Sequence, residues 1–143
     1  MCIRDRPSSE RFVTALAPVL VWNIDALALP ALQYDLARAG VPGRLPWMLE
    51  NVLQALAQQP RPTDRHWRLR WARAAVVLEG FLAHLRRLEQ ADGAPDPFEP
   101  GIRSQKSQEQ IWTRASAISR RWGIVSALQV EDFASALGAA CAV

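Results

Sequence analysis

DRHWRLRWARAAVVLEGFLAHLRRLEQA, residues 64–91, is the stretch of sequence that decides the fold. Its apolar residues recur at alternating spacings of four and three, a pattern typical of a helix packed along one seam. The seam consists of Trp67, Trp71, Ala74, Leu78, Phe81, Leu85 and Leu88. Because further apolar residues widen this seam, we expect a helix from Asp64 to Ala91, capped by Thr63, at the centre of a helical bundle. Gly80 costs such a helix roughly 1 kcal/mol relative to Ala, so it indicates a closely packed second helix or a kink.

Two shorter helices are expected before the long one. Pro30 and Pro46 each suit a first helical turn and Gly40 ends the earlier helix, so residues 29–39 and 46–58 are predicted to be helical. The predicted buried faces are Leu29, Leu32, Leu36 and Ala39 in the first helix and Trp47, Leu49, Val52, Leu53 and Leu56 in the second.

The N-terminal region begins with a further predicted helix. Ser8 or Ser9 can cap it, Phe12, Val13 and Leu16 share one of its faces, and Pro18 is expected to end it. Residues 19–22 are apolar and too few to decide between a strand and an extended connector.

The first six residues, MCIRDR, resemble the translated adapter read that begins open reading frames from metagenomic assemblies. This resemblance implies that residues 1–8 are a disordered, non-native start and that the native protein continues upstream.

The C-terminal third follows a linker. Residues 92–104 contain three prolines and two glycines, a composition typical of a connection between lobes or across one end of a bundle. Beyond it, one helix is expected from Ser107 to Gly123, with an apolar stripe of Ile111, Ala115, Ile118 and Trp122, and a last one over residues 131–140. The predicted fold is therefore all-α, an irregular bundle of five to six helices. Residues 9–91 form its main domain and residues 105–143 a C-terminal helical pair that packs on it.

Composition sets limits on the class of protein. The chain has 143 residues, 50% of them hydrophobic and 22% charged, which excludes intrinsic disorder, collagen-like repeats and a disulfide scaffold. Cys2 and Cys141 have no partners at metal-ligand spacing, and they indicate a reducing compartment. There is no secretory signal and no apolar run long enough for a transmembrane helix, so we expect a cytoplasmic protein without membrane contact.

Signals of catalysis are missing from the sequence. His66 and His84 are the only histidines, and neither has Cys, Asp or Glu three or four positions away to build a metal-binding face. There is no Gly-rich phosphate loop and no Gly-x-Ser-x-Gly motif. The sequence therefore predicts no metal, no cofactor and no catalytic residue, hence no enzyme.

One histidine spacing resembles a catalytic motif. Arg61 and His66 are separated by four residues, and this spacing resembles the ribonuclease motif of HEPN-type helical domains, which places an acid/base pair on one helix. Pro62 follows Arg61 directly, so we expect the two residues to straddle the start of a helix and not to share a face.

A DNA-binding motif is a second alternative. Residues 29–56 give a helix, a turn at Gly40 and a second helix, which partly resembles a helix-turn-helix, as in a transcriptional regulator or an antitoxin-like protein. Asp35 and Pro46 depart from that pattern, and Arg44 is the one base-reading candidate on the early turn of the second helix. A plain helical hairpin is the favoured interpretation.

Arginine supplies the strongest polar signal. Lys106 is the only lysine among 17 basic residues, and the net charge is +3. The candidate contacts to an anion or a partner are Arg44, Arg65, Arg68, Arg70 and Arg73. We therefore expect a non-enzymatic helical interaction or regulatory domain from the C-terminal part of a longer bacterial protein, with a protein or an upstream domain as its partner. The alternatives are the DNA-binding regulator and an accessory helical domain of an enzyme whose catalytic part lies upstream. The sequence leaves the oligomeric state open.

Overall fold

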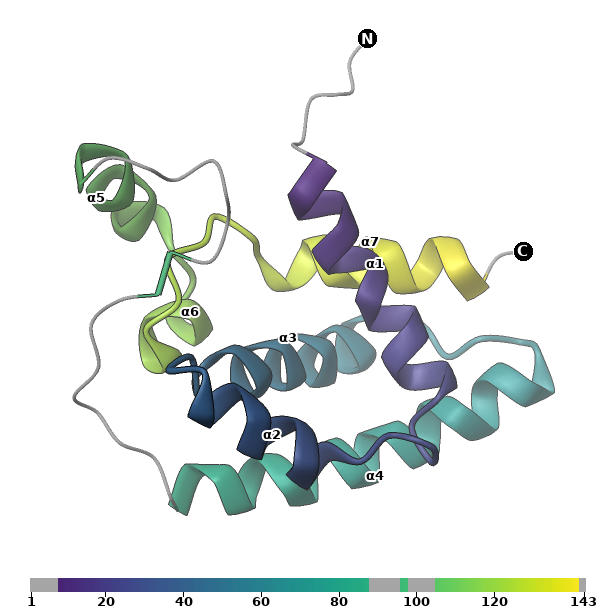
Figure 1. The fold of residues 1–143 in the computed structure, drawn as a ribbon. Helices are drawn as coiled ribbons and strands as arrows, with labels where there is room; N and C mark the ends of the chain where they lie inside the picture. Colours follow the sequence, from purple (N-terminus) through teal and green to yellow (C-terminus); the bar gives the residue numbers. More distant parts are fainter. Residues whose placement is uncertain (1–7, 88–95, 98–104, 142–143) are drawn as a thin grey trace, which may run out of the picture.

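The computed structural model describes residues 8–87, 96–97 and 105–141, and Figure 1 shows their fold. In these ranges the regular structure is helical, apart from one isolated parallel bridge between Asp96 and Ile124. The helices are α1 (Ser8–Trp22), α2 (Leu29–Arg38), α3 (Arg44–Gln58), α4 (Arg65–Arg87), α5 (Gln105–Arg114), α6 (Ala117–Trp122) and α7 (Val130–Cys141). The fold is all-α, as the sequence predicts. No described helix has both the length and the apolar character needed to cross a membrane.

The centre of the bundle is α3 rather than the longest helix. It packs against α7, α4, α6 and α2, with α4 beneath it and α7 above it in Figure 1. Every residue from Leu45 to Val52 is buried, including Trp47 and the carboxylate-bearing Glu50. The expectation that the long helix over residues 64–91 forms the centre is therefore wrong. Among the described helices, α4 packs mainly against α3 and α1, which cover one of its sides.

The seam of α4 is confirmed in its described part. Trp71, Ala74, Leu78 and Leu85 are buried, while Trp67 and Phe81 are half-buried; Leu88 lies outside the described residues. The helix begins at Arg65, and its cap is Asp64, whose side chain accepts a hydrogen bond from the backbone N–H of Trp67 at 2.9 Å. Thr63 is therefore not the cap.

Gly80 lies on the uncovered side of α4. A Cβ built on it would have no atom of another element within 4 Å. The close approach of a second helix that the sequence predicts at this position is not made within the described part of the chain.

Pro18 lies inside α1 and does not end it, and residues 19–22, left open between strand and connector, are helical. Proline removes one backbone hydrogen bond from a helix interior. The residues beyond it, Leu20 and Val21, are buried against the core, and their burial offsets this loss. The prediction that Ser8 is disordered is wrong, because Ser8 belongs to α1. Residues 1–7 lie outside the described range.

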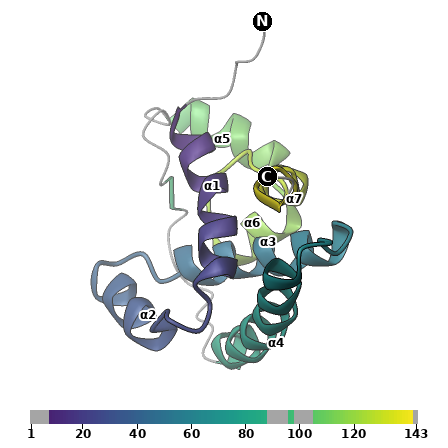
Figure 2. The same ribbon diagram turned by 90° about the vertical axis from the view of Figure 1, so that its right-hand side faces the viewer.

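The bounds predicted for α2 are confirmed, but its predicted buried face is wrong. Gly40 ends the helix in a left-handed conformation (φ 84°). Leu29 is buried and Leu36 half-buried, whereas Leu32 and Ala39 are exposed. The reason is that α3 is the described helix against which α2 mainly packs, and α2 projects away from α1 in Figure 2.

The single helix predicted from Ser107 to Gly123 is two helices in the structure. The Ser116 hydroxyl accepts a hydrogen bond from the Ser119 N–H at 3.1 Å and caps α6, so the chain breaks between α5 and α6. Gly123 ends α6 in the left-handed conformation (φ 70°), as predicted. The last predicted helix is confirmed as α7, which buries Phe133 and Leu137 against α3 and α1.

Candidate interaction surface

Arg44, at the start of α3, is committed to a contact inside the protein. Its Nε and Nη2 atoms donate to the two carboxylate oxygens of Asp96 at 2.7 and 3.0 Å. This hydrogen-bonded pair raises the pKa of the Arg44 guanidinium further above its ordinary value. The backbone of Asp96 in turn bonds to Gly123 and Val125, so Arg44 fixes part of the predicted 92–104 linker beside the end of α6.

Arg70 is likewise bound within the fold. Its Nε donates to the carbonyl oxygen of Trp22 at 3.0 Å, and its guanidinium lies 3.9 Å from the centroid of the Trp22 ring. Trp22 also contacts Trp67, with 4.7 Å between ring centroids. A cation at the last carbonyl of α1 complements the helix dipole, so Arg70 joins the end of α1 to the start of α4.

Arg73 pairs with Asp25, in the connection between α1 and α2, at 2.7 Å. Both side chains are more than half exposed, so this surface ion pair contributes at most about 1 kcal/mol. Asp25 was not predicted to have this role, because nothing in the local sequence links it to a residue 48 positions later.

Arg65 and Arg68 remain exposed at the start of α4. Arg68 Nη1 donates a long hydrogen bond to the Thr63 carbonyl oxygen, at 3.4 Å. Because α3 and α4 form an antiparallel hairpin, Arg44 lies near the opposite end of α4 from this pair (Figure 1). The five predicted contact residues therefore do not share one face.

Large apolar side chains lie beside Arg65 and Arg68. Leu69 is 60% exposed and Val76 67% exposed, on the side of α4 opposite its seam. We call this side the outer α4 face; it consists of Arg65, Arg68, Leu69, Ala72, Val76, Glu79, Gly80, Ala83 and Arg87, all exposed. Residues at spacings of three, four and seven along it lie one above another on the helix.

A second apolar face lies on α1. Phe12 is 69% exposed, Val19 is 56% exposed, and Leu16 lies between them one turn from each. The adjoining side of the helix buries Val13, Ala17, Leu20 and Val21, so the apolar surface of α1 extends beyond its buried side.

Sequence reasoning did not identify the most constrained polar cluster in the fold. Glu50 of α3 is 2% exposed, and its carboxylate accepts hydrogen bonds from Arg86 Nη2 at 3.1 Å, from Trp122 Nε1 at 2.7 Å and from Arg121 Nη1. The cluster joins α3, α4 and α6. The one signal in the sequence is a charged residue that directly follows the apolar run from Leu45 to Leu49.

Beside this cluster, a second buried polar contact joins α3 to α6. Trp47 Nε1 donates to the hydroxyl of Ser119 at 2.9 Å, and Ser119 is fully buried. Since buried polar groups destabilise a fold unless they are paired, these contacts fix the register of α6 on α3. The arrangement supplies stability.

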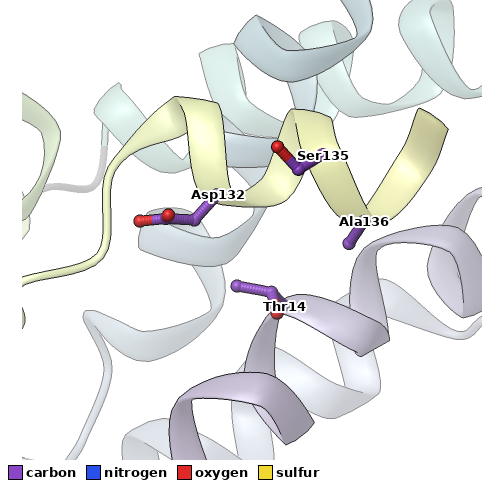
Figure 3. A pocket seen from close by; sticks show the side chains of 4 residues that line it. All are labelled: Thr14, Asp132, Ser135 and Ala136. Atoms are coloured by element: carbon purple, nitrogen blue, oxygen red, sulfur yellow. The ribbon is translucent and has the colours of Figure 1, made fainter. Parts of the chain in front are cut away.

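Two shallow hollows lie on the described surface. One, between α1 and α7, has a volume of about 370 Å³ and is lined by Thr14, Asp132, Ser135 and Ala136 (Figure 3). The other, of about 480 Å³, lies between α3 and α4 and includes Arg61, Trp71 and Glu79. The described residues bring no three His, Cys, Asp or Glu side chains together as metal ligands.

The two motif alternatives fare differently. A DNA-reading helix-turn-helix over residues 29–56 requires an exposed second helix, but α3 is buried in the bundle and Arg44 is paired with Asp96, so this part of the alternative is wrong. Arg61 lies before α4 and lines the second hollow, which His66, in the first turn of α4, does not line. The pair does not share a helix face, as expected.

Comparison with known proteins identifies no relative of this chain. No family model, no curated protein and no solved structure matches the chain.

Proposed function

We propose that the protein is a non-enzymatic helical interaction domain, and that its contact surface is the outer α4 face. The observation that carries the proposal is the exposure of Leu69 and Val76 on a side of α4 that no other described helix covers. A stretch of exposed apolar side chains rimmed by charged ones is typical of a protein–protein contact.

The arginines support a protein partner over a nucleic acid. Arg70 and Arg73 already have partners within the fold, which leaves Arg65 and Arg68 at one end of the proposed surface and Arg87 near the other. Nucleic-acid binding requires several positive charges that neutralise phosphates together. Contact of Leu69 and Val76 with the phosphate backbone would add nothing to its affinity. Arginine beside exposed apolar residues is, by contrast, a common composition of protein interfaces.

The low number of cysteines supports a reducing compartment, so we propose that the contact is made in the cytoplasm. Whether the partner is an upstream domain of the same protein or a separate chain is decided by the experiment below.

The test is site-specific photo-crosslinking in the native host. A photoreactive amino acid replaces Val76, and in a matched control it replaces Ala37, which is exposed on α2 away from this face. A crosslink from position 76 with none from position 37 supports the proposal: a product of higher mass identifies a separate chain, and a crosslinked peptide of the same chain, mapped by mass spectrometry, identifies an upstream domain. Absence of any crosslink from position 76 overturns it.

A further inference from the structure

We infer that the partner of the outer α4 face is a second copy of this chain, bound through an antiparallel pair of α4 helices that cross at Val76. This inference rests on the proposed function, because it assigns an occupant to the same surface. Large, small and charged residues follow one another along the face in an order that matches a second copy of the same face.

The face is complementary to itself in size. Leu69 lies seven residues before Val76, and Ala83 lies seven residues after it. A two-fold axis at Val76 therefore sets each Leu69 level with Ala83 of the second copy and beside its Gly80. A large residue then meets small ones at both ends of the contact, and the two Val76 side chains meet at its centre.

Gly80 has no role within the described fold that would explain it. It lies inside an exposed helix, where glycine is unfavourable, and a Cβ there would meet no atom of another element. In the antiparallel pair, the missing side chain provides the space for Leu69 of the second copy. The close helix approach indicated by this glycine is then made between chains.

Glu79 and Arg68 favour the antiparallel direction. Glu79 and Arg68 lie on the same flank of the outer α4 face. In an antiparallel pair the same flanks of the two helices face each other, and the 1.5 Å rise per residue puts Glu79 about 7.5 Å along the axis from Arg68 of the second copy. An arginine side chain spans this offset, and the symmetry forms the ion pair twice. A parallel pair would instead set Leu69 against Leu69 and Arg65 against Arg65.

Disulfide crosslinking of the purified full chain tests the register directly. In a Cys2→Ser, Cys141→Ser background, Val76→Cys is expected to form a disulfide-linked dimer. Leu69→Cys alone is not, because its two copies would be about 21 Å apart along the axis. A mixture of Leu69→Cys and Ala83→Cys chains is expected to form the mixed dimer. Crosslinking of Leu69→Cys with itself, or no crosslinking of Val76→Cys, would overturn the inference.

Sedimentation equilibrium supplies an independent readout on the unmodified chain, which we expect to be a reversible dimer. Leu69→Asp is expected to raise the dissociation constant at least about 100-fold, since each of the two copies loses apolar burial worth tenfold or more. Gly80→Leu is expected to weaken the dimer while leaving the fold at least as stable, because leucine is the better helix former. A chain that stays monomeric at every concentration overturns the inference.

Charge reversal tests the ion pair. Glu79→Arg is expected to weaken the dimer, and Arg68→Glu in the same chain is expected to restore it. Arg65 and Arg87 of the second copy lie level at the rim, two like charges, so Arg87→Glu is expected to tighten the dimer. Failure of both the rescue and the tightening contradicts the antiparallel register.

The outcomes separate this inference from the proposed function. A monomeric chain whose position 76 still crosslinks to a different protein in the native host overturns the second copy as partner and leaves the interaction domain in place. A chain that neither dimerises nor crosslinks from position 76 overturns both.

Discussion

Replacement of Glu50 by glutamine should lower the free energy of unfolding by about 2–3 kcal/mol. The carboxylate is buried and accepts hydrogen bonds from Arg86, Arg121 and Trp122. Glutamine keeps one acceptor oxygen for the two guanidiniums, but its NH₂ group then faces the Trp122 N–H, so this buried donor is left unsatisfied at a cost of roughly 1–3 kcal/mol, and the arginine bonds lose their charged acceptor. The loss is partly offset, because the neutral amide is cheaper to bury and the two half-exposed arginines regain water.

Thermal and urea unfolding, followed by circular dichroism, measure this loss. For a chain of this size it corresponds to a fall in Tm of roughly 5–10 °C. Asp35→Asn, on the exposed side of α2, is the matched control and should stay within about 0.5 kcal/mol of the parent. The double change Arg86→Met, Arg121→Met should cost more than the two single changes together, because either arginine alone still neutralises the buried carboxylate. A Glu50→Gln chain within about 1 kcal/mol of the parent would refute this account of the cluster.

Three further predictions concern other contacts of the fold. Gly43→Ala should destabilise the protein, because the new Cβ would lie 2.4 Å from the backbone carbonyl oxygen of Trp122; an unchanged Tm would contradict this packing. Arg70→Ala should cost roughly 1–2 kcal/mol through loss of the Trp22 contacts, measured by urea unfolding, and Arg70→Lys should recover only part of it. Burial raises the pKa of the Cys141 thiol, so its thiolate fraction at pH 7.5 is below that of a free cysteine. Alkylation of Cys141 by iodoacetamide in a Cys2→Ser chain should therefore be slower than that of a free thiol and should accelerate up to a pH above 9; a rate equal to that of free cysteine would contradict the burial.

The parts of the fold that sequence could predict are those where local chemistry and tertiary packing agree. The helices α3, α4 and α7 have long periodic apolar faces, and Gly40 and Gly123 are the left-handed residues that end α2 and α6. In each case the signal lies within a few residues of the element it defines.

The errors arise where packing by distant residues decides. Pro18 is a helix breaker by local criteria, but Ala17 before it and Leu20 and Val21 after it pack into the core. Leu32 has the spacing of a buried residue, yet no helix in the described part of the chain covers its side of α2. The sequence near a residue does not reveal whether another element packs over its face of the helix.

The candidate site shows the same limit more sharply. Arg65, Arg68, Arg70 and Arg73 form one cluster in the sequence, but successive helical residues turn by about 100°, so these four point to different sides of α4. Arg70 and Arg73 reach the end of α1 and the connection after it, where carbonyl and carboxylate oxygens lie. A cluster along a helix is therefore not a cluster on a surface.

The side chains around the exposed arginines indicate what these arginines bind. A phosphate-binding surface gathers cations and exposes them to solvent. Arg65 and Arg68 instead border a row of apolar and small residues, which includes Gly80 with open space above it. Exposed apolar side chains gain free energy only when something removes them from water. A surface whose large residues match its own small ones about a single point, and whose one acid matches its own arginine, meets that condition best with another copy of itself.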